Sequence, residues 1–253
     1  MNPIRSEQFL WTEEKRLVSQ SSVPHSPFHQ STFSMDGQLK IGSNRQTMLT
    51  HKEDLLSPKT RLGIWTDKGT SWFSTNEWDL FPGYYQKNEL LVSHAYHRGM
   101  HLLITAFDRT NQHDNGFVRT LSIKNQSEQH TSFKLLIHQQ SLIPDREDAL
   151  TFYVPEERAL IHHQEHMSTL VAARFEDDIQ VRYEAGSYEK NWNEATGTAL
   201  FSPLASGSAE SLIVMNADMK PHQEIKGNMW VLHHESLMGL EEAHHSVQTD
   251  VLK

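Results

Sequence analysis

The sequence predicts an all-β protein, a large sandwich of two antiparallel sheets followed by one C-terminal helix. Between Phe28 and Trp230, apolar residues recur at every second position in short runs, which is the period of a strand with one buried face. Turn-forming residues separate successive runs, and helical patterns do not alternate with them. This combination favours a β-sandwich over a parallel sheet with crossover helices.

The two ends of the chain differ from this middle region. Residues 1–27, which include the stretch SQSSVPHSP, predict an N-terminal arm that is either mobile or an added edge segment. Residues 235–253 place apolar side chains and His244 at spacings of three and four, which predicts an amphipathic helix of about five turns. We therefore expect an arm over 1–27, a sandwich domain over 28–234 and a linker helix over 235–253.

The clearest strand pattern lies near the middle of the chain. Residues 117–124 alternate apolar with polar side chains, and residues 132–138 repeat the alternation. The Asn-Gln-Ser-Glu stretch at 125–128 predicts a hairpin turn between them. Further tight turns are expected at 36–37 and 67–69, where glycine can adopt a positive φ. The other predicted strands are 61–66, 90–97, 100–107, 211–217 and 224–233.

Composition and charge exclude several classes of protein. Lys and Arg number 23 and Asp and Glu number 32, so the formal net charge is −9, which opposes binding to nucleic acid. Without cysteine there is no disulfide, thiolate zinc site or Cys nucleophile. The N-terminal residues lack the apolar core of a signal peptide, and no apolar run approaches the roughly 18 residues that a membrane span needs. We expect a cytoplasmic protein that binds neither nucleic acid nor membrane.

The 17 histidines are scattered, and one group of them fits a zinc motif. His162-His163-Gln164-Glu165-His166 matches H-x-x-E-H, in which two histidines on a helix hold zinc and the glutamate activates water. The same stretch also reads as two strands, 159–163 and 168–173, joined by a turn. We favour the strands and predict no metal and no cofactor, and a histidine metalloprotein stays as an alternative.

Acidic residues next to one another do not identify a catalytic pair. Paired carboxylates cleave glycosidic bonds, and candidates occur at 145–148, 177–178 and 241–242. Neighbouring residues of a strand face opposite ways, so we interpret these acids as solvated. The sequence also lacks a glycine-rich phosphate loop and a G-x-S-x-G elbow. No catalytic residue is predicted in this chain.

Seven aromatic residues crowd the segment 65–85. Their rings either fill the space between two sheets or stack on the apolar faces of sugar rings. Trp72 and Trp78 lie beside polar turns rather than inside an alternating run. We therefore name Trp72, Trp78 and Tyr84 as candidate carbohydrate-binding residues.

Six stretches, taken in order, resemble one known family. They are DGQLKIGSNRQ, RLGIWTDKGTSWFSTNEWDL, GFVRTLSIKNQSEQHTSFKLLIHQQ, DALTFYVPEERALIHH, NWNEATGTALFSPLASGSAES and MNADMKPHQEIKGNMWVLHHESLMGLEEAH. From Phe33 to Lys253 the chain is similar to the N-terminal β-sandwich domain of bacterial and archaeal glucoamylase-type enzymes of glycoside hydrolase family 15. The likeness comes from the collinear order of the stretches.

The resemblance implies a large supersandwich of the galactose mutarotase type and a linker helix that leads into an (α/α) barrel. In that family two catalytic glutamates lie in the barrel, and no position of this chain matches their motifs, so no catalytic residue is carried over. The segment that is rich in Asp and Glu in the family is here 192–197 and less acidic.

Two functions follow as hypotheses. The first is a non-catalytic sandwich domain that packs against the catalytic (α/α) barrel of a glucoamylase-like hydrolase of α-glucosidic bonds. The second is a free-standing module that grips α-glucan oligosaccharides through exposed aromatic side chains. In both cases we expect this chain alone not to hydrolyse maltose or starch.

Overall fold

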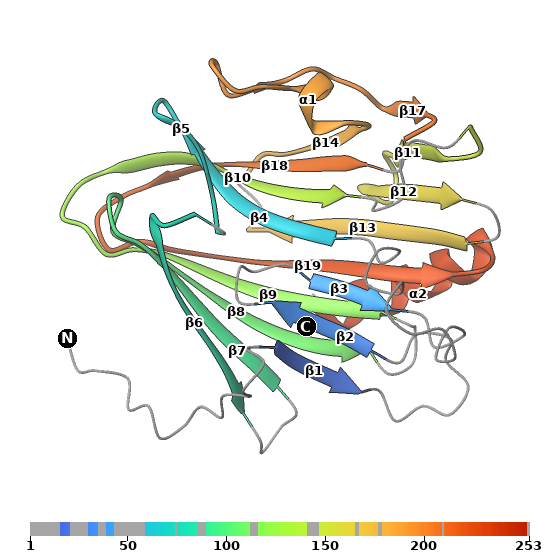
Figure 1. The fold of residues 1–253 in the computed structure, drawn as a ribbon, viewed down its shortest axis with the longest axis horizontal. Coiled ribbons are helices and arrows are strands. Elements are labelled where there is room, and N and C mark those ends of the chain that lie inside the picture. The colour runs from blue at the N-terminus through green and yellow to red at the C-terminus, as the bar shows by residue number, and fades with distance from the viewer. Residues whose placement is uncertain are drawn as a thin grey trace.

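The computed structural model contains two large antiparallel sheets that face each other as a β-sandwich (Figure 1). It describes residues 16–20, 30–34, 39–42, 59–73, 75–85, 90–111, 116–140, 147–164, 167–176, 179–208 and 210–251. The predicted fold class is confirmed. The expected turn at 36–37 lies outside the described residues.

Sheet A contains eight of the described strands and sheet B contains nine. The order in sheet A is β1 (Arg16–Gln20), β2 (Gln30–Ser34), β3 (Leu39–Gly42), β4 (Lys59–Thr66), β10 (Thr131–Gln140), β18 (Ser211–Met219) and β14 (Val181–Ala185), and β5 (Gly69–Trp72) pairs with β4. The order in sheet B is β17 (Leu204–Ser206), β11 (Leu150–Val154), β12 (Ala159–Gln164), β13 (Met167–Phe175), β19 (Glu224–His234), β9 (Gly116–Asn125), β8 (Leu102–Asn111), β7 (Leu90–His97) and β6 (Trp78–Tyr85).

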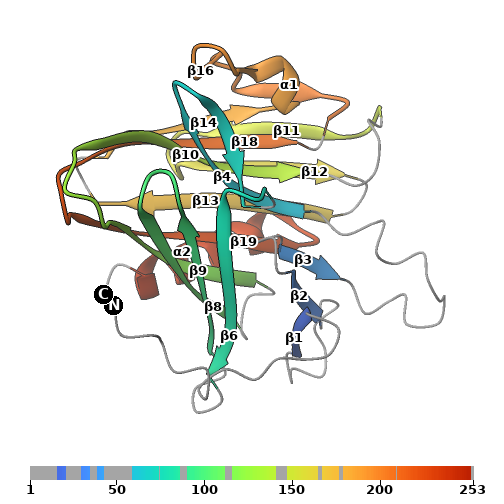
Figure 2. The same ribbon diagram turned by 60° about the vertical axis from the view of Figure 1, so that its left-hand side comes forward.

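Three short elements and one longer helix complete the described fold. Helix α1 (Tyr188–Asn191) leads into β15 (Trp192–Asn193), which pairs with β16 (Thr198–Ala199). In both ribbon views α1 lies next to β14 (Figures 1 and 2). Helix α2 (Leu237–Val251) confirms the helix predicted at the C-terminal end of the sequence. It is not long and apolar enough to cross a membrane, and neither is any other described helix.

The main core lies between the two sheets. Alternate residues of each strand point inward, and Leu135 and Ile137 of β10 meet a cluster that includes Leu121 and Ile123 of β9. A buried ion pair lies among them, in which Arg119 donates to Asp108 through Nε at 2.6 Å and Nη2 at 2.8 Å. Both side chains are at most 2% exposed, so the removal of either partner would leave a buried charge at a cost of about 3–5 kcal/mol.

A smaller core joins α2 to the outer face of sheet B. Leu240, Ala243 and Val247 of the helix pack on a cluster that includes Trp230 and Leu232 of β19. Gly239 allows the helix to begin close to the sheet, because a Cβ there would lie 2.2 Å from the ring of His234. Most of the periodic face predicted from the sequence is therefore the face that docks, whereas Leu237 at its start is exposed.

Part of the predicted N-terminal arm is a strand. Residues 16–20 form β1, which pairs antiparallel with β2 at one edge of sheet A. This matches an added edge segment, one of the two alternatives for the arm. The domain limits themselves stay a prediction.

The turn at 125–128 is not a hairpin, which corrects our expectation. Strand β9 pairs with β8 and β19 in sheet B, whereas β10 pairs with β4 and β18 in sheet A, so this turn carries the chain from one sheet to the other. Alternation identified both strands, but it does not say which partner each strand takes. By contrast, the turn at 67–69 joins the paired strands β4 and β5, and Gly69 has a φ of 111°.

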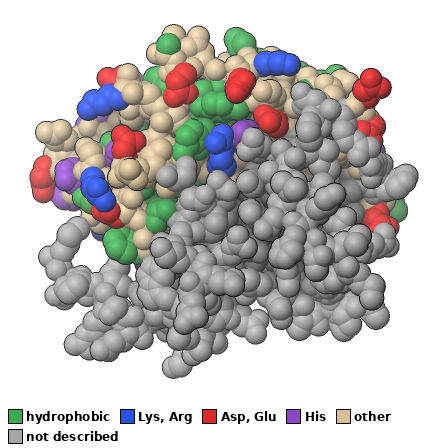
Figure 3. Space-filling view, viewed as in Figure 1, with side chains coloured by type: hydrophobic (Ala, Val, Ile, Leu, Met, Phe, Trp, Pro, Cys, Tyr) green, Lys and Arg blue, Asp and Glu red, His purple; other side chains and the backbone are tan. Residues whose placement is uncertain are grey.

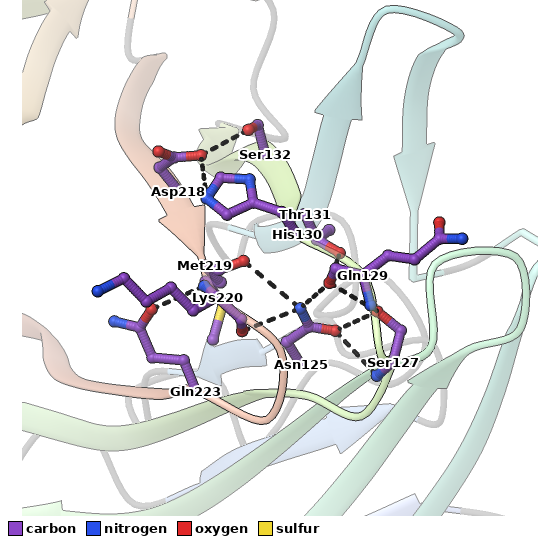
Figure 4. A network of polar contacts seen from close by, with 10 residues as sticks. All are labelled: Asn125, Ser127, Gln129, His130, Thr131, Ser132, Asp218, Met219, Lys220 and Gln223. Atoms are coloured by element: carbon purple, nitrogen blue, oxygen red, sulfur yellow. Dashed lines mark hydrogen bonds and ion pairs between the residues drawn. The ribbon is translucent and has the colours of Figure 1, made fainter.

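One buried asparagine holds this crossing in place (Figure 4). The side-chain amide of Asn125 donates to the carbonyl oxygens of Gln129 at 2.8 Å and Lys220 at 3.1 Å. Its oxygen accepts from the backbone N–H of Ser127 at 3.0 Å. Because Lys220 lies in the other connection between the sheets, Asn125 ties the two crossings together.

Candidate functional site

The candidate site is an aromatic cluster on the outer face of sheet A, formed by Trp65, Trp72, Tyr188 and Trp192. Its base is the outer side of β10 and β18, with Leu136, Leu212 and Val214. The segment 188–199 covers it with α1, β15 and β16. On this face of the molecule, hydrophobic side chains lie among acidic, basic and histidine side chains (Figure 3).

Two glycines let the cluster form. A Cβ at Gly63 would lie 2.6 Å from the ring of Trp72, the residue paired with it on β5, so glycine lets this ring lie over β4. Gly197 has a φ of 60°, and a Cβ there would lie 2.4 Å from the ring of Trp65. In both contacts the backbone of the glycine packs directly against an aromatic ring. A side chain in place of either glycine would clash with that ring.

The rings pack against one another, and cations lie over them. Trp65 and Trp192 meet edge to face at 6.1 Å between centroids, and Trp72 meets Tyr188 at 5.4 Å. The Arg61 guanidinium lies 4.2 Å from the centre of the Trp72 ring. Such cation–π contacts favour a fixed position for both partners.

Glu194 fastens the covering segment to the sheet. Its carboxylate accepts hydrogen bonds from the backbone N–H of Thr70 at 2.7 Å and the Tyr188 hydroxyl at 2.8 Å. It also accepts from the indole N–H of Trp192 at 3.1 Å. Burial raises the pKa of Glu194, but these hydrogen bonds together hold it below its usual range. Glu194 is therefore an ionised structural group.

Three ionisable side chains in contact with one another border the aromatic cluster. They are Arg61, His138 and Glu210. Arg61 Nη2 donates to His138 Nδ1 at 2.8 Å, so the proton of the neutral ring is on Nε2, which faces Glu210 Oε2 at 3.6 Å. Burial lowers the pKa of His138, the Arg61 charge adds to this effect, and Glu210 opposes it. The interaction with His138 is also the main reason that the pKa of Glu210 is lowered.

The three candidate carbohydrate-binding residues lie in different environments. Trp72 is half-buried in the aromatic cluster. Trp78 is 5% exposed, its ring lies 4.3 Å from that of Phe73 in a tilted contact, and its indole N–H donates to Ser71 at 2.9 Å. Our expectation that Trp78 is exposed is thus corrected, because its ring fills the space between the sheets. Tyr84 lies on β6, and its side chain is outside the described residues.

The zinc-motif geometry does not form in the described part of the chain. Residues 159–164 and 167–175 are strands β12 and β13, paired so that Gln164 lies opposite Met167. His162 is buried with Nε2 2.9 Å from the Ser211 hydroxyl, whereas His163 Nδ1 lies 2.9 Å from the Ser168 hydroxyl. Glu165 and His166 are outside the described residues. The strand interpretation is confirmed. Because successive residues of a strand face opposite ways, His162 and His163 point to opposite faces of the sheet.

The acidic groups named from the sequence do not meet as a catalytic pair. Glu147, Asp148, Glu241 and Glu242 are exposed. Residues 145 and 177–178 lie outside the described part. The two carboxylates that border the aromatic cluster, Glu194 and Glu210, were not singled out from the sequence, where nothing distinguishes them from other acids.

Comparisons with known proteins give similarity in structure and none in sequence. No protein-family model matches the chain, and no curated protein does. A bacterial glucoamylase complexed with acarbose is similar with a TM-score of 0.65 and 11% identity, over 95% of this chain and 35% of that one. A putative kojibiose phosphorylase from the human microbiome gives 0.55 and 11%, over 96% and 36%. The protein Slr1438 from Synechocystis sp. PCC 6803 gives 0.51 and 7%, over 87% and 96%.

These neighbours show the fold that the chain has. Its length is about a third of that of the glucoamylase and the phosphorylase, and about the whole of the Synechocystis protein. The chain therefore has a β-sandwich fold that makes up about a third of the glucoamylase chain and nearly all of the Synechocystis protein.

Proposed function

We propose that this chain is the non-catalytic sandwich domain of a cytoplasmic, glucoamylase-like hydrolase of family 15, and that it packs against a helical (α/α) catalytic barrel. The collinear motifs support this family, and the glucoamylase similarity supports a domain that makes up about a third of a larger enzyme. In the parent enzyme, two carboxylates of the barrel would cleave the α-glucosidic bond with inversion.

The observation that carries the proposal is an apolar row across the outer face of sheet B. Cross-strand pairing aligns Leu204, Phe152, Ile161, Leu170 and Leu232 in that order from the β17 edge. Residues paired directly across antiparallel strands point to the same face, so all five face outward. Helix α2 covers the inner end of this row, whereas Leu204 is 59% exposed.

Other exposed apolar side chains lie close to this row in the sequence or on the helix beside it. The described part of the chain has six exposed large hydrophobic side chains, and five of them are in residues 200–204 or in the first turn of α2. They are Leu200, Phe201, Leu204, Leu237 and Met238, of which Phe201 is 78% exposed. Exposed large apolar side chains in two short segments of this kind favour a surface that a partner covers.

The site on sheet A supports a structural role for this chain. Glu194 accepts three hydrogen bonds that hold the covering segment, and Glu210 faces a buried histidine. The contacts described for these two carboxylates are those of structural groups. In this proposal, bond cleavage belongs to the partner.

The test uses the helical polypeptide that is encoded after this chain or next to it. We expect the two to form a stable complex, and the double variant Leu204→Ser with Phe201→Ser to weaken association at least tenfold, measured by calorimetry. Phe81→Ser is the matched control, because Phe81 is 52% exposed on β6 at the far edge of sheet B. The lack of any such polypeptide, or equal weakening by the control, would contradict the proposal.

A second candidate is a free-standing carbohydrate-binding module. It is favoured by the half-buried Trp72, whose ring lies beside the polar groups of Arg61 and Tyr188. Titration with maltooligosaccharides would then quench tryptophan fluorescence saturably, and Trp72→Ala would abolish the effect. Trp78→Phe is the control, because that ring is buried. Unchanged fluorescence during the titration would refute the module and leave the scaffold.

A further inference from the structure

Three metal-ligating side chains converge where α2 crosses the end of sheet B. Glu157 lies in the turn between β11 and β12, and Glu241 and His245 lie on α2. Because Glu241 and His245 are four residues apart, they share one face of the helix. One ligand atom from each of the three side chains lies within 4.8 Å of the other two.

The charges of this group are not balanced by a basic side chain. His245 Nε2 lies 3.2 Å from Glu157 Oε2. Within the part of the chain that the structure describes, no lysine or arginine forms an ion pair with Glu157 or Glu241. Two carboxylates and an imidazole thus face a common point with no fixed cation between them.

The buried His244 contacts Glu157. His244 is completely buried, and its Nδ1 accepts a hydrogen bond from the indole N–H of Trp230 at 3.0 Å. Its Nε2 faces the Glu157 backbone carbonyl oxygen at 3.2 Å, Glu157 Oε2 at 3.3 Å and the Gln248 side-chain amide at 2.7 Å. His244 thus fixes the backbone of the turn that carries Glu157, and residues that position a ligand from behind are typical of the surroundings of metal sites.

We propose that Glu157, Glu241 and His245 bind one divalent cation of the zinc class, which fastens α2 to the turn between β11 and β12. One nitrogen and two oxygen donors from protein, with water in the fourth position, suit zinc. Calcium and magnesium prefer six or more oxygen donors and are not expected here. Donor atoms around tetrahedral zinc are about 3.3 Å apart, which the exposed side chains of Glu241 and His245 reach by a change of rotamer.

The site would act on the attachment of α2 to sheet B. Helix α2 is the only described helix on sheet B. A cation bound by the three side chains would hold it more firmly on that sheet. The inference does not depend on the proposed function, because all three ligands belong to this chain.

The test is calorimetric titration of the untagged full chain with zinc chloride at pH 7.5 after removal of metals. We expect one saturable site and an increase of several degrees in the midpoint of thermal unfolding, since a ligand that binds the folded state stabilises it. Glu241→Gln and His245→Ala should each lower the affinity at least tenfold and remove the thermal shift. Magnesium chloride should give neither effect.

Matched controls separate this site from other histidines and acids. Glu242→Gln changes the adjacent exposed carboxylate, and His222→Ala removes an exposed histidine that faces Glu128. Neither control should change zinc affinity. Glu241 and His245 are exposed, so their variants are expected to fold, which circular dichroism checks. Weak non-saturable binding, or the same affinity in His245→Ala as in the unchanged chain, would overturn the inference.

Discussion

The outer faces of the two sheets are covered in different ways. On sheet A the chain covers its own strands with the segment 188–199, and Glu194 and Arg61 fix that cover through hydrogen bonds and cation–π contacts. On sheet B the helix α2 packs mainly on β13 and β19 through apolar contacts, and the row continues to the exposed Leu204. The chain itself covers the outer face of sheet A, whereas the outer face of sheet B has the features of an interface.

The difference shows that an aromatic surface is not by itself a ligand site. The cluster on sheet A has four aromatic rings, yet they contact each other and the backbone of Gly63 and Gly197. The apolar row on sheet B has few aromatic side chains, yet its outer end has no described cover. Four measurements test this difference between the two faces.

The largest effect is expected where the cover of sheet A is anchored. Trp192→Ala should lower the free energy of unfolding by about 3–5 kcal/mol, because Trp192 is buried against Trp65 and the outer side of β10 and β18. Urea unfolding followed by circular dichroism measures it. A loss below about 1 kcal/mol would mean that the cover contributes little to the fold.

Next comes a comparison along the row of sheet B. Leu232→Ala, beneath α2, should cost about 3 kcal/mol, whereas Leu204→Ala, on the same face, should cost less than about 0.5 kcal/mol. The same urea experiment measures both variants. Equal losses would show that Leu204 is packed by this chain alone and would weaken the interface proposal.

Stability should also fall in mild acid. Burial, with the nearby His162 adding to it, lowers the pKa of His233 to about 4, whereas a histidine in the unfolded chain takes up its proton near pH 6.5. Between these values the unfolded chain binds one more proton, so stability falls as the pH falls, by on the order of 3 kcal/mol in all. Urea midpoints from pH 7 to 4 measure it.

His233→Gln is the variant that tests this assignment, because it removes the titrating group but keeps a polar side chain. It should flatten the decrease in acid, even if its stability at pH 7 is lower. His138 on sheet A, whose pKa burial also lowers, should contribute in the same direction. A decrease of unchanged size in His233→Gln would assign the acid sensitivity to other groups.

The smallest effect is expected at the clamp of sheet A. Glu194→Gln keeps one acceptor oxygen but loses the charge that holds three donors, so we expect a cost of about 1 kcal/mol. Glu189→Gln on the exposed side of α1 is the matched control and should be neutral. No difference between the two would mean that ring packing alone holds the cover.

Local patterns predicted much of the fold. Period-two alternation identified most of the long strands, and spacings of three and four identified α2 with its buried Leu240, His244 and Val247. The segment 188–199 was not predicted as a cover, because a four-residue helix and two-residue strands are too short to show a period. The carbohydrate-binding role of Trp72, Trp78 and Tyr84 stays a prediction.

The amino-acid order by itself determined the strand pattern, the C-terminal helix and the turn at 67–69, because these depend on residues only two to four positions apart. Only the tertiary structure decided that 125–128 crosses between sheets, that Trp78 is buried, and that Glu157 meets residues of α2. Those outcomes depend on contacts between residues far apart in the chain, and alternation along one strand cannot say which distant strand will lie beside it.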